Sequence, residues 1–179
     1  MESASRSQPK VLIVVDAQKG FVAPSSEHVL AMLEALQSRF DRVVLTKFHN
    51  PDPSPFRRIL KYSELAPGDE DTALAIAPRG DASVIARALY TCVTPELLGI
   101  LHDWGVDEVH VAGIATEACV LKTALDLFEA DIRPIVIADA CASDKNDRFH
   151  TMAMELITSL IGTDNVINSA ALSDQPCAA

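Results

Sequence analysis

Long apolar segments, a surplus of positive charge and paired cysteines are all missing from this chain of 179 residues. No apolar stretch approaches the roughly 18 residues that a membrane-spanning helix needs. The formal net charge of -10 argues against non-specific binding to nucleic acid or to an anionic membrane. The chain does not open with the basic and apolar regions of a secretion signal. We therefore expect a cytoplasmic protein that binds neither nucleic acid nor membranes.

Cysteine is scarce, and its four copies are spread along the chain. Cys92, Cys119, Cys141 and Cys177 include no Cys-x-x-Cys spacing and no short Cys/His cluster, so the sequence indicates neither a zinc site nor a dithiol redox motif. Without a secretion signal, reduced thiols are the default state. A redox sensor in which Cys119 pairs with Cys92 or Cys141 stays open as an alternative role for these thiols.

Apolar runs alternate with helical patterns along the chain. Aromatic residues make up 5% and hydrophobic residues 49%, which is typical of an α/β enzyme with an aliphatic core. We expect strands over residues 10–16, 42–48, 83–87, 107–114, 132–138 and 164–167, and helices over residues 26–40, 94–104, 116–129 and 144–161. The proline-rich segment 50–55 begins a long irregular excursion that runs to residue 71.

Strands that alternate with helices form a parallel sheet with helices on both faces. We therefore predict a single-domain, Rossmann-like α/β fold of three layers, with a mostly parallel sheet of five to six strands in the order 3-2-1-4-5-6. The domain is expected over residues 10–170, between a disordered leader (residues 1–9) and a flexible tail (residues 171–179). Ligands bind such sheets beyond the carboxyl ends of the strands, where the strand order reverses.

One cysteine lies where a strand pattern gives way to a helix pattern. Residues 113–120 read Gly-Ile-Ala-Thr-Glu-Ala-Cys-Val, with Thr116 as the expected N-cap and Cys119 in the first helical turn. Unpaired N–H groups and the positive end of the helix dipole would favour the thiolate, which is the reactive form of cysteine. Cys119 is therefore a candidate nucleophile, and a buried structural cysteine is the alternative.

Asp16 ends the first predicted strand, which lies beside the strand that precedes Cys119 in the predicted order. The carboxylate and the thiol would then face each other across one crevice. A cysteine nucleophile needs a partner that takes or holds its proton, and Asp16 is our candidate for that base. An aspartate that caps a helix or stabilises a turn is the alternative.

Four segments resemble those of the isochorismatase-like cysteine hydrolases, a family related to nicotinamidase and N-carbamoylsarcosine amidohydrolase. Residues 14–21 (Val-Val-Asp-Ala-Gln-Lys-Gly-Phe) resemble the family's Asp-x-Gln-x-x-Phe opening, and residues 113–120 resemble its Gly-x-x-Thr-Asp-x-Cys-Val segment. Residues 84–91 are similar to its third-strand segment, and residues 138–140 are similar to its motif after strand five. The resemblance covers residues 11–167.

The resemblance implies a Rossmann-like fold with an Asp–Lys–Cys triad, in which the cysteine attacks an amide or related carbonyl and forms a thioester that water hydrolyses. Asp16 matches the acid and Cys119 matches the nucleophile. The family also has a non-proline cis peptide before the cysteine, which here would join Ile114 to Ala115. Such a bond would direct the backbone N–H groups of Ala115 and Cys119 into one pocket as an oxyanion hole.

The departure from the family pattern is at residue 87, where Arg87 matches the family's lysine. Arginine keeps the positive charge and could favour a thiolate, but it is bulkier and does not give up its proton at ordinary pH. Lys19 and Lys47 are alternative cations for this role. The competing interpretation makes each of them a surface or loop charge.

Phe21, Phe48 and Tyr90 are expected to form apolar walls of the crevice, with core packing as the alternative for the two phenylalanines. After the second predicted strand, only His49 and Asp52 could bind a metal, and two residues that flank a proline do not make a site. We therefore expect no metal and no cofactor, which argues against a nicotinamidase.

These patterns together predict a cysteine hydrolase that cleaves a small amide or ureido C–N bond through a thioester, with Asp16, Arg87 and Cys119 as catalytic residues. The alternative is a non-catalytic member of the same fold, a pseudoenzyme with a binding or scaffold role, because arginine replaces the lysine. The expected partner is a small-molecule substrate. Relatives of this fold suggest a homo-oligomer, either a dimer or a tetramer.

Overall fold

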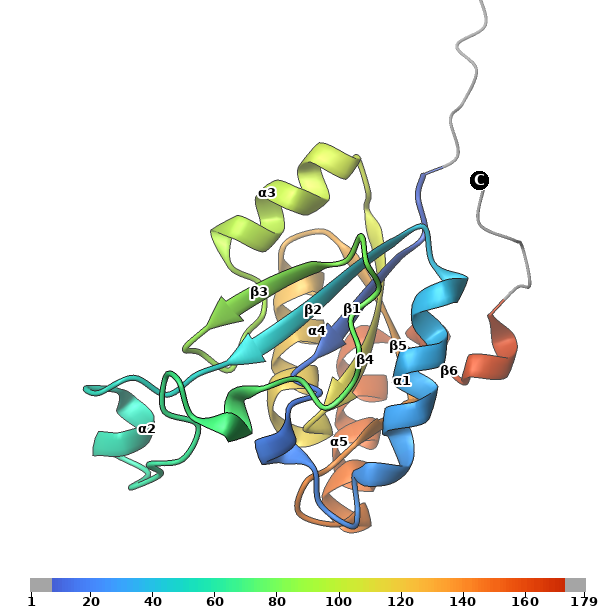
Figure 1. Cartoon of the computed structure of the whole chain (residues 1–179). Helices are drawn as coiled ribbons and strands as arrows, with labels where there is room; N and C mark the ends of the chain where they lie inside the picture. Colours follow the sequence, from blue (N-terminus) through green and yellow to red (C-terminus); the bar gives the residue numbers. More distant parts are fainter. Residues whose placement is uncertain (1–7, 173–179) are drawn as a thin grey trace, which may run out of the picture.

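The computed structural model describes residues 8–172 and shows a six-stranded sheet with helices packed on both faces (Figure 1). The strands are β1 (Val11–Val15), β2 (Arg42–Phe48), β3 (Ser83–Arg87), β4 (Glu108–Ile114), β5 (Arg133–Ala142) and β6 (Val166–Ile167). Every neighbouring pair is parallel, and the order is β3-β2-β1-β4-β5-β6. The predicted Rossmann-like architecture and strand order are therefore confirmed.

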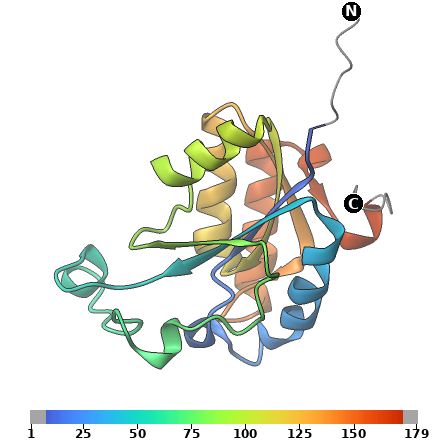
Figure 2. The same ribbon diagram turned by 45° about the horizontal axis from the view of Figure 1, so that its top comes forward.

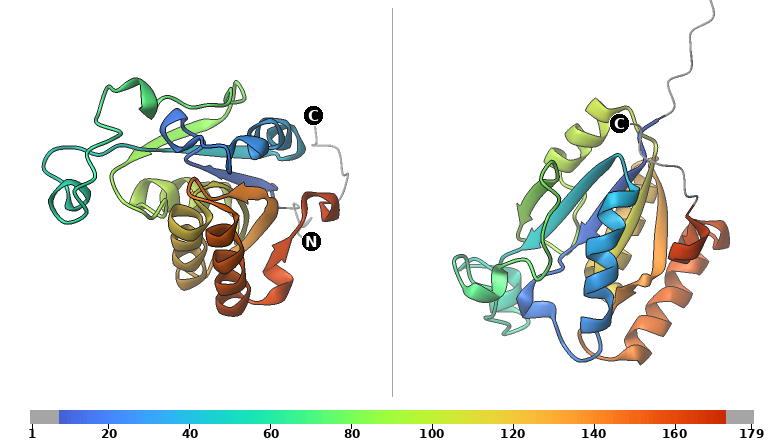
Figure 3. Two further views of the ribbon diagram at one scale, coloured as in Figure 1. Left: turned by 90° about the horizontal axis from the view of Figure 1, so that it is seen from below. Right: turned by 45° about the vertical axis from the view of Figure 1, so that its right-hand side comes forward.

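Five α-helices form within the described residues. They are α1 (Leu30–Leu36), α2 (Pro55–Arg58), α3 (Pro95–Trp104), α4 (Leu121–Glu129) and α5 (Asp147–Ile161). Helix α1 covers one face, whereas α3, α4 and α5 lie side by side on the other (Figure 3). Right-handed crossovers between parallel strands require this division, because the chain leaves β1 and β4 in opposite directions along the sheet.

Strand β1 lies at the centre of the core. All five of its residues are fully buried, because helices cover both faces of the sheet around it. Burying each of these aliphatic side chains stabilises the fold by about 1.5–3 kcal/mol. Phe40, at the chain's entry into β2, is also fully buried and packs against His110 of β4 with ring centroids 5.0 Å apart.

The ends of α3 follow directly from its sequence. The side chain of Thr94 accepts a hydrogen bond from the N–H of Leu97 (3.3 Å) and so acts as the N-cap. Pro95 stands at the first helical position, where its missing N–H costs nothing. Gly105 ends the helix in the left-handed conformation with φ 66°.

Three other helices, α1, α4 and α5, are shorter than the hydrophobic patterns predict. The expected helix over residues 26–40 divides into α1 and two flanking 3-10 turns, Glu27–Val29 and Gln37–Arg39. Helix α5 begins at Asp147 rather than at residue 144, because Asn146 is its N-cap and accepts hydrogen bonds from two N–H groups of the first turn at 3.1 and 3.3 Å. Strand β5 runs four residues further than predicted, to Ala142.

The excursion between β2 and β3 extends past the carboxyl ends of these strands and carries α2 (Figures 1 and 2). It is anchored by a small apolar cluster of Phe48, Phe56 and Leu65. Gln18 ties it to the sheet, because Nε2 donates to the carbonyl groups of Phe48 and Thr72 (2.9 Å each) and Oε1 accepts from the N–H of Phe48 (2.6 Å). The excursion is thereby held over the carboxyl edge of the sheet.

Strands β1 and β4 approach each other closely at Gly113, whose φ is 131°. A Cβ atom on this residue would lie 2.1 Å from the carbonyl oxygen of Val15, so only glycine fits here. The register between β4 and β5 shifts at the same place, between Val111 and Gly113. This contact brings the end of β1, and with it Asp16, against the end of β4.

The described chain ends slightly beyond the predicted domain boundary. Ser169–Ala171 forms a 3-10 turn, and Leu172 packs against the core with 5% of its surface exposed. Residues 1–7 and 173–179, which include most of the predicted leader and tail and Cys177, lie outside the described residues. Within the described part of the chain, no helix has the length and apolar character needed to cross a membrane.

Gly113→Ala is expected to lower the free energy of unfolding by at least about 3 kcal/mol, because the new Cβ overlaps the Val15 carbonyl in a backbone conformation that L-residues rarely adopt. Gly99→Ala is the matched control. Gly99 lies inside α3 with no atom within 4 Å of an added Cβ, so alanine should stabilise by up to about 1 kcal/mol. Urea unfolding followed by circular dichroism measures both, and equal stability of the two variants would contradict the close approach of β1 and β4.

Candidate active site

The predicted catalytic residues come from three strands and meet at the carboxyl edge of the sheet. Asp16 directly follows β1, Arg87 ends β3, and Cys119 lies in the first turn after β4. Asp16 and Arg87 form an ion pair, and they shift the pKa of the Cys119 thiol in opposite directions. Because the strand order reverses between β1 and β4, this site lies at the topological switch point of the sheet.

Asp16 is fully buried, and each of its carboxylate oxygens has its own partner. Oδ1 accepts a hydrogen bond from Oγ1 of Thr46 (2.8 Å), and Oδ2 accepts one from Nη2 of Arg87. The backbone N–H of Asp16 donates to Oγ1 of Thr46 (3.2 Å). Taking a carboxylate out of water costs several kcal/mol, and the Arg87 ion pair together with these hydrogen bonds offsets that cost.

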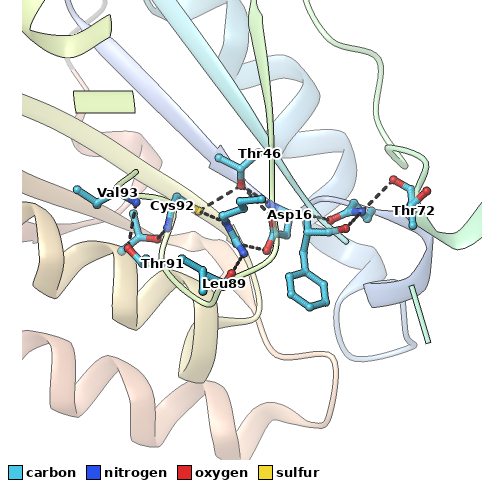
Figure 4. A network of polar contacts seen from close by, with 11 residues as sticks. Asp16, Thr46, Thr72, Leu89, Thr91, Cys92 and Val93 are labelled. Carbon is cyan, nitrogen blue, oxygen red and sulfur yellow. Dashed lines mark hydrogen bonds and ion pairs between the residues drawn. The ribbon is translucent and has the colours of Figure 1, made fainter. Parts of the chain in front are cut away.

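Arg87 is 4% exposed and is held at three points, by Asp16, Leu89 and Cys92, which are labelled in Figure 4. Its Nη2 donates to Asp16, its Nη1 donates to the carbonyl oxygen of Leu89, and its Nε donates to Sγ of Cys92 (3.1 Å). Burial by itself would lower the pKa of the guanidinium, but the charge of Asp16 raises the pKa above its ordinary value. Arg87 is therefore a fixed positive charge rather than a proton donor.

The turn that carries Cys119 differs from the predicted one. Thr116–Val120 forms a π-helical turn, and α4 begins only at Leu121. The prediction that Thr116 is the N-cap is wrong, since Ala115 flanks the turn and no side chain caps it. Oγ1 of Thr116 instead shares a hydrogen bond with Nδ1 of His150 on α5 (2.9 Å), so a tertiary contact occupies the hydroxyl.

The Cys119 thiol is held in its protonated form. Only 6% of the residue is exposed, and this burial raises the pKa of the thiol well above its ordinary value. The Asp16 carboxylate raises the pKa further, whereas Arg87 lowers it through its charge and a hydrogen bond. The loss of hydration thus outweighs the helix terminus and the arginine, which were expected to favour the thiolate. Reaction at this sulfur needs a base.

Cys119 lines a cavity of about 190 Å³ with largely aromatic walls. Phe21, Phe48 and Tyr90, the predicted wall residues, all line this cavity, as does Ala115. Sequence reasoning did not assign the remaining lining residues to the walls, and these are Phe56, Leu60, Tyr62, Glu117, Ala118, Asp144 and Lys145. Phe56, Leu60 and Tyr62 belong to the excursion, whose folded path no periodic pattern revealed.

The aromatic wall is a chain of ring contacts, two of which are edge-to-face. The ring of Phe56 lies between Phe48 and Tyr90, with centroid separations of 4.9 and 4.8 Å. Phe21 continues the chain at 6.2 Å from Phe48. Aromatic pairs prefer such geometry, and each adds about 0.5–1.5 kcal/mol beyond the area that it buries. The packing gives the cavity a fixed shape.

Charged side chains occupy one part of the cavity lining. Oε1 of Glu117 accepts a hydrogen bond from Oγ of Ser143 (3.0 Å) and lies 3.4 Å from Nζ of Lys145. Burial, together with the neighbouring Glu117, raises the pKa of the Asp144 carboxyl. The cavity therefore combines an apolar wall with a small group of charges.

Thr46 and Cys92 are site residues that sequence reasoning missed. Thr46 lies on β2, and the predicted adjacency of β1 and β2 could have placed it beside Asp16. No sequence signal indicated that the chain after β3 folds back so that Sγ of Cys92 lies 3.3 Å from Oγ1 of Thr46. Lys19, considered as a substitute cation, instead pairs with Glu70 at the surface (2.7 Å).

The peptide bond between Ile114 and Ala115 is cis, as the family resemblance implies. Cys92, Cys119 and Cys141 are free thiols. Burial raises the pKa of the Cys141 thiol to about 12. The residues present do not fit a zinc site, because no three His, Cys, Asp or Glu side chains converge within residues 8–172. Independence of a metal remains a prediction.

This chain belongs to the isochorismatase-like hydrolases, because the family model of the isochorismatase domain matches residues 10–167. The chain is 29% identical to a nicotinamidase of Acinetobacter baylyi, over 83% of this chain and 88% of the relative. It is 27% identical to phenazine biosynthesis protein PhzD1 of Pseudomonas aeruginosa, over 88% and 84% of the two chains. The structure of a pyrazinamidase from Pyrococcus horikoshii in complex with zinc matches with a TM-score of 0.78 at 22% identity, covering 89% of this chain and 98% of that one. The predicted family is confirmed.

Alkylation of Cys119 by iodoacetamide is expected to accelerate past about pH 9 without a plateau, because only the thiolate reacts and burial keeps the pKa of the thiol raised. Peptide mass spectrometry over the range from about pH 6 to pH 10 measures the rate, with N-acetylcysteine as a free thiol of pKa near 8.5. A plateau already reached below about pH 7 would reveal a resident thiolate and contradict the expectation.

Arg87→Met is expected to lower the free energy of unfolding by about 3–5 kcal/mol, because it leaves the buried Asp16 carboxylate without its counter-ion. Arg87→Lys keeps a positive charge and should lose clearly less. Urea unfolding measures both variants. The double variant Arg87→Met/Asp16→Asn is the control, and its failure to recover any of the lost stability would show that the ion pair is not the cause.

Proposed function

We propose that this protein is a cysteine hydrolase that cleaves the C–N bond of a small amide or ureido compound through a thioester. The observation that carries the proposal is the buried cluster of Asp16, Arg87 and Cys119, with Cys119 in the wall of an apolar cavity. The cluster supplies a nucleophile, a proton acceptor and a fixed positive charge. Acyl transfer at a carbonyl uses these three kinds of group.

The first half of the reaction forms the thioester. Sγ of Cys119 bonds to the carbonyl carbon while the thiol proton passes to the carboxylate of Asp16. Each carboxylate oxygen has two lone pairs, so the existing bonds from Thr46 and Arg87 leave room for this proton. The proton then moves to the amide nitrogen as the C–N bond breaks, and ammonia or an amine leaves.

The second half returns the enzyme to its starting state. Water adds its oxygen to the acyl carbon and gives one proton to Asp16. The C–S bond then breaks, the proton returns from Asp16 to the sulfur of Cys119, and the acid product leaves. Over the whole cycle one water is consumed and one C–N bond is cleaved, so the atoms and protons balance.

Arg87 takes an electrostatic role in this scheme. It lowers the pKa of the Cys119 thiol, opposing burial and Asp16, and thereby favours the transfer of the thiol proton. Because the guanidinium does not give up its proton at ordinary pH, the shuttle runs through Asp16 alone. The backbone N–H groups of Ala115 and Cys119, both cavity-lining residues, are the proposed oxyanion hole.

The cavity limits the size and character of the substrate. Its volume of about 190 Å³ equals that of roughly six water molecules, which suits a compact acyl group and excludes a folded polypeptide. The aromatic side chains of Phe21, Phe48 and Tyr90 favour a flat or aliphatic group over a strongly hydrated one. We therefore expect a compact, largely apolar amide.

A second candidate function is binding without catalysis. The resting Cys119 is protonated and Arg87 is engaged by Asp16, Leu89 and Cys92, so the site lacks the neutral amine that a lysine could supply. In that case the same cavity would hold a small ligand that does not react. The two functions differ in whether a bound amide releases ammonia.

Wild-type protein is expected to release ammonia from one or more members of a panel of compact primary amides and N-carbamoyl compounds. Cys119→Ala and Asp16→Asn should lower this release at least about a thousandfold, because each removes a group that takes part in the covalent step. A coupled glutamate dehydrogenase assay measures the ammonia. Cys141→Ala is the control, since that thiol is buried and does not line the cavity.

Two outcomes would reject the hydrolase. Ammonia release that survives Cys119→Ala rules out a thioester on this cysteine. A panel member that raises the thermal unfolding temperature of the wild type but releases no ammonia supports the binding function instead.

A further inference from the structure

Four buried side chains at the site form a closed circuit of hydrogen bonds, which we call the buried polar ring: Asp16, Thr46, Cys92 and Arg87 (Figure 4). Nε of Arg87 lies 3.1 Å from Sγ of Cys92, and Sγ lies 3.3 Å from Oγ1 of Thr46. Oγ1 of Thr46 lies 2.8 Å from Oδ1 of Asp16, and Oδ2 of Asp16 bonds to Nη2 of Arg87. At most 4% of any of these four residues is exposed.

Only one arrangement of protons satisfies the buried polar ring. The Asp16 carboxylate can only accept, so the hydroxyl proton of Thr46 points at Oδ1. Thr46 then has no proton left for Cys92, so the thiol of Cys92 donates to Oγ1 of Thr46. Sγ of Cys92 in turn accepts from Nε of Arg87. Cys92 must therefore stay protonated, and burial does raise the pKa of this thiol.

The backbone of Cys92 is itself held in place. Its N–H donates to Oγ1 of Thr123 on α4 (3.2 Å), and its carbonyl oxygen accepts from the N–H of Thr94 (2.9 Å). Cys92 thus connects the segment after β3 to the helix that follows Cys119. The position of Sγ is fixed in this way, and the hydrogen bond from Nε of Arg87 to Sγ therefore orients the arginine side chain.

The guanidinium group has five N–H donors in one plane. Three of them bond to Asp16, to the carbonyl oxygen of Leu89 and to Cys92. Two donors remain, one on each terminal nitrogen, and the charge of Arg87 lowers the pKa of the Cys119 thiol. A lysine offers a single nitrogen on a flexible stem and could not use a bond to Cys92 to set its orientation.

We propose that Cys92 is a positioning residue, which fixes the plane of the Arg87 guanidinium through Nε and thereby the position of its charge relative to the Cys119 thiol. The proposal rests on the proposed function, in which Arg87 serves the Cys119 sulfur. Cys92 is fully buried and does not line the cavity, so it acts through Arg87 and does not touch the substrate. The hydrogen bond to Cys92 is the contact that allows an arginine at position 87 to serve the Cys119 sulfur in place of the family's lysine.

The test is the pH dependence of Cys119 alkylation by iodoacetamide, read by peptide mass spectrometry on the full chain. Cys92→Ala should lower the rate constant near pH 8 by roughly three- to tenfold and move the pH profile upward by about half to one pH unit, because a loosened Arg87 favours the thiolate less. Cys92→Ser should restore the rate to within about twofold of the wild type, since a hydroxyl accepts from Nε and donates to Thr46. Cys141→Ala, which removes another buried thiol, should leave the rate unchanged.

The decisive comparison measures the effect of Cys92→Ala in protein that already carries Arg87→Lys. In that variant no Nε–H exists, so adding Cys92→Ala should change the alkylation rate by less than about twofold. A fold change as large as in the wild-type background would show that Cys92 acts on packing alone and would overturn the proposal. Equal pH profiles for the wild type and Cys92→Ala would overturn it as well. If Cys92→Ala does not fold, Thr46→Val removes the ring partner to which the Cys92 thiol donates and carries the same expectation.

Alkylation requires no turnover, so its outcome is separate from that of the ammonia assay. If the protein releases no ammonia but Cys92→Ala lowers the alkylation rate as expected, the role of Cys92 in the buried polar ring is supported and the hydrolase function is rejected. If the protein hydrolyses amides but Cys119 is alkylated at the same rate in Cys92→Ala as in the wild type, the hydrolase function is supported and the role of Cys92 is rejected.

Discussion

The site depends on the buried ion pair between Asp16 and Arg87. Both charges are almost completely removed from water, which costs several kcal/mol for each ion, and their mutual attraction repays this only with good geometry and further hydrogen bonds. Thr46 and Cys92 supply those further bonds from β2 and from the segment after β3. The strand order β3-β2-β1-β4 brings all of these groups together, so the fold and the ion pair require each other.

The electrostatics of the site follow from this pair. Asp16 and Arg87 have opposite effects on the Cys119 thiol, and burial, the largest influence, keeps the thiol protonated. In the proposed reaction the sulfur is consequently activated by proton transfer to Asp16 rather than by a resident thiolate. Arginine suits this arrangement because its charge is permanent and its several donors can be fixed at once. The burial of Asp16, Arg87 and Cys119 strengthens each of these interactions, because charges attract more strongly where the dielectric constant is low.

Much of the architecture and part of the site could be predicted from local sequence patterns. The buried apolar runs gave the strands, and Thr94, Pro95 and Gly105 gave the bounds of α3. The positions of Asp16 and Cys119 at neighbouring strand ends indicated that the two side chains lie in one region, and in the structure Cys119 lines the cavity whereas Asp16 is fully buried behind it. Thr116 and Thr46 show where such reasoning stops, because the hydroxyl of each bonds to a residue at least 30 positions away, and no local pattern carries that information.

The amino-acid sequence alone carries the order of strands and helices, the glycine at position 113 and the residue types available for chemistry. These depend on periodicity, backbone freedom and residue identity, which are local properties. The folded chain was needed to show that Cys119 is buried with a raised pKa, that the excursion contributes Phe56 and Tyr62 to the cavity, and that Cys92 holds Arg87. Hydration and hydrogen bonding at a buried group depend on every segment packed around it, and so they are set only when the whole chain has folded.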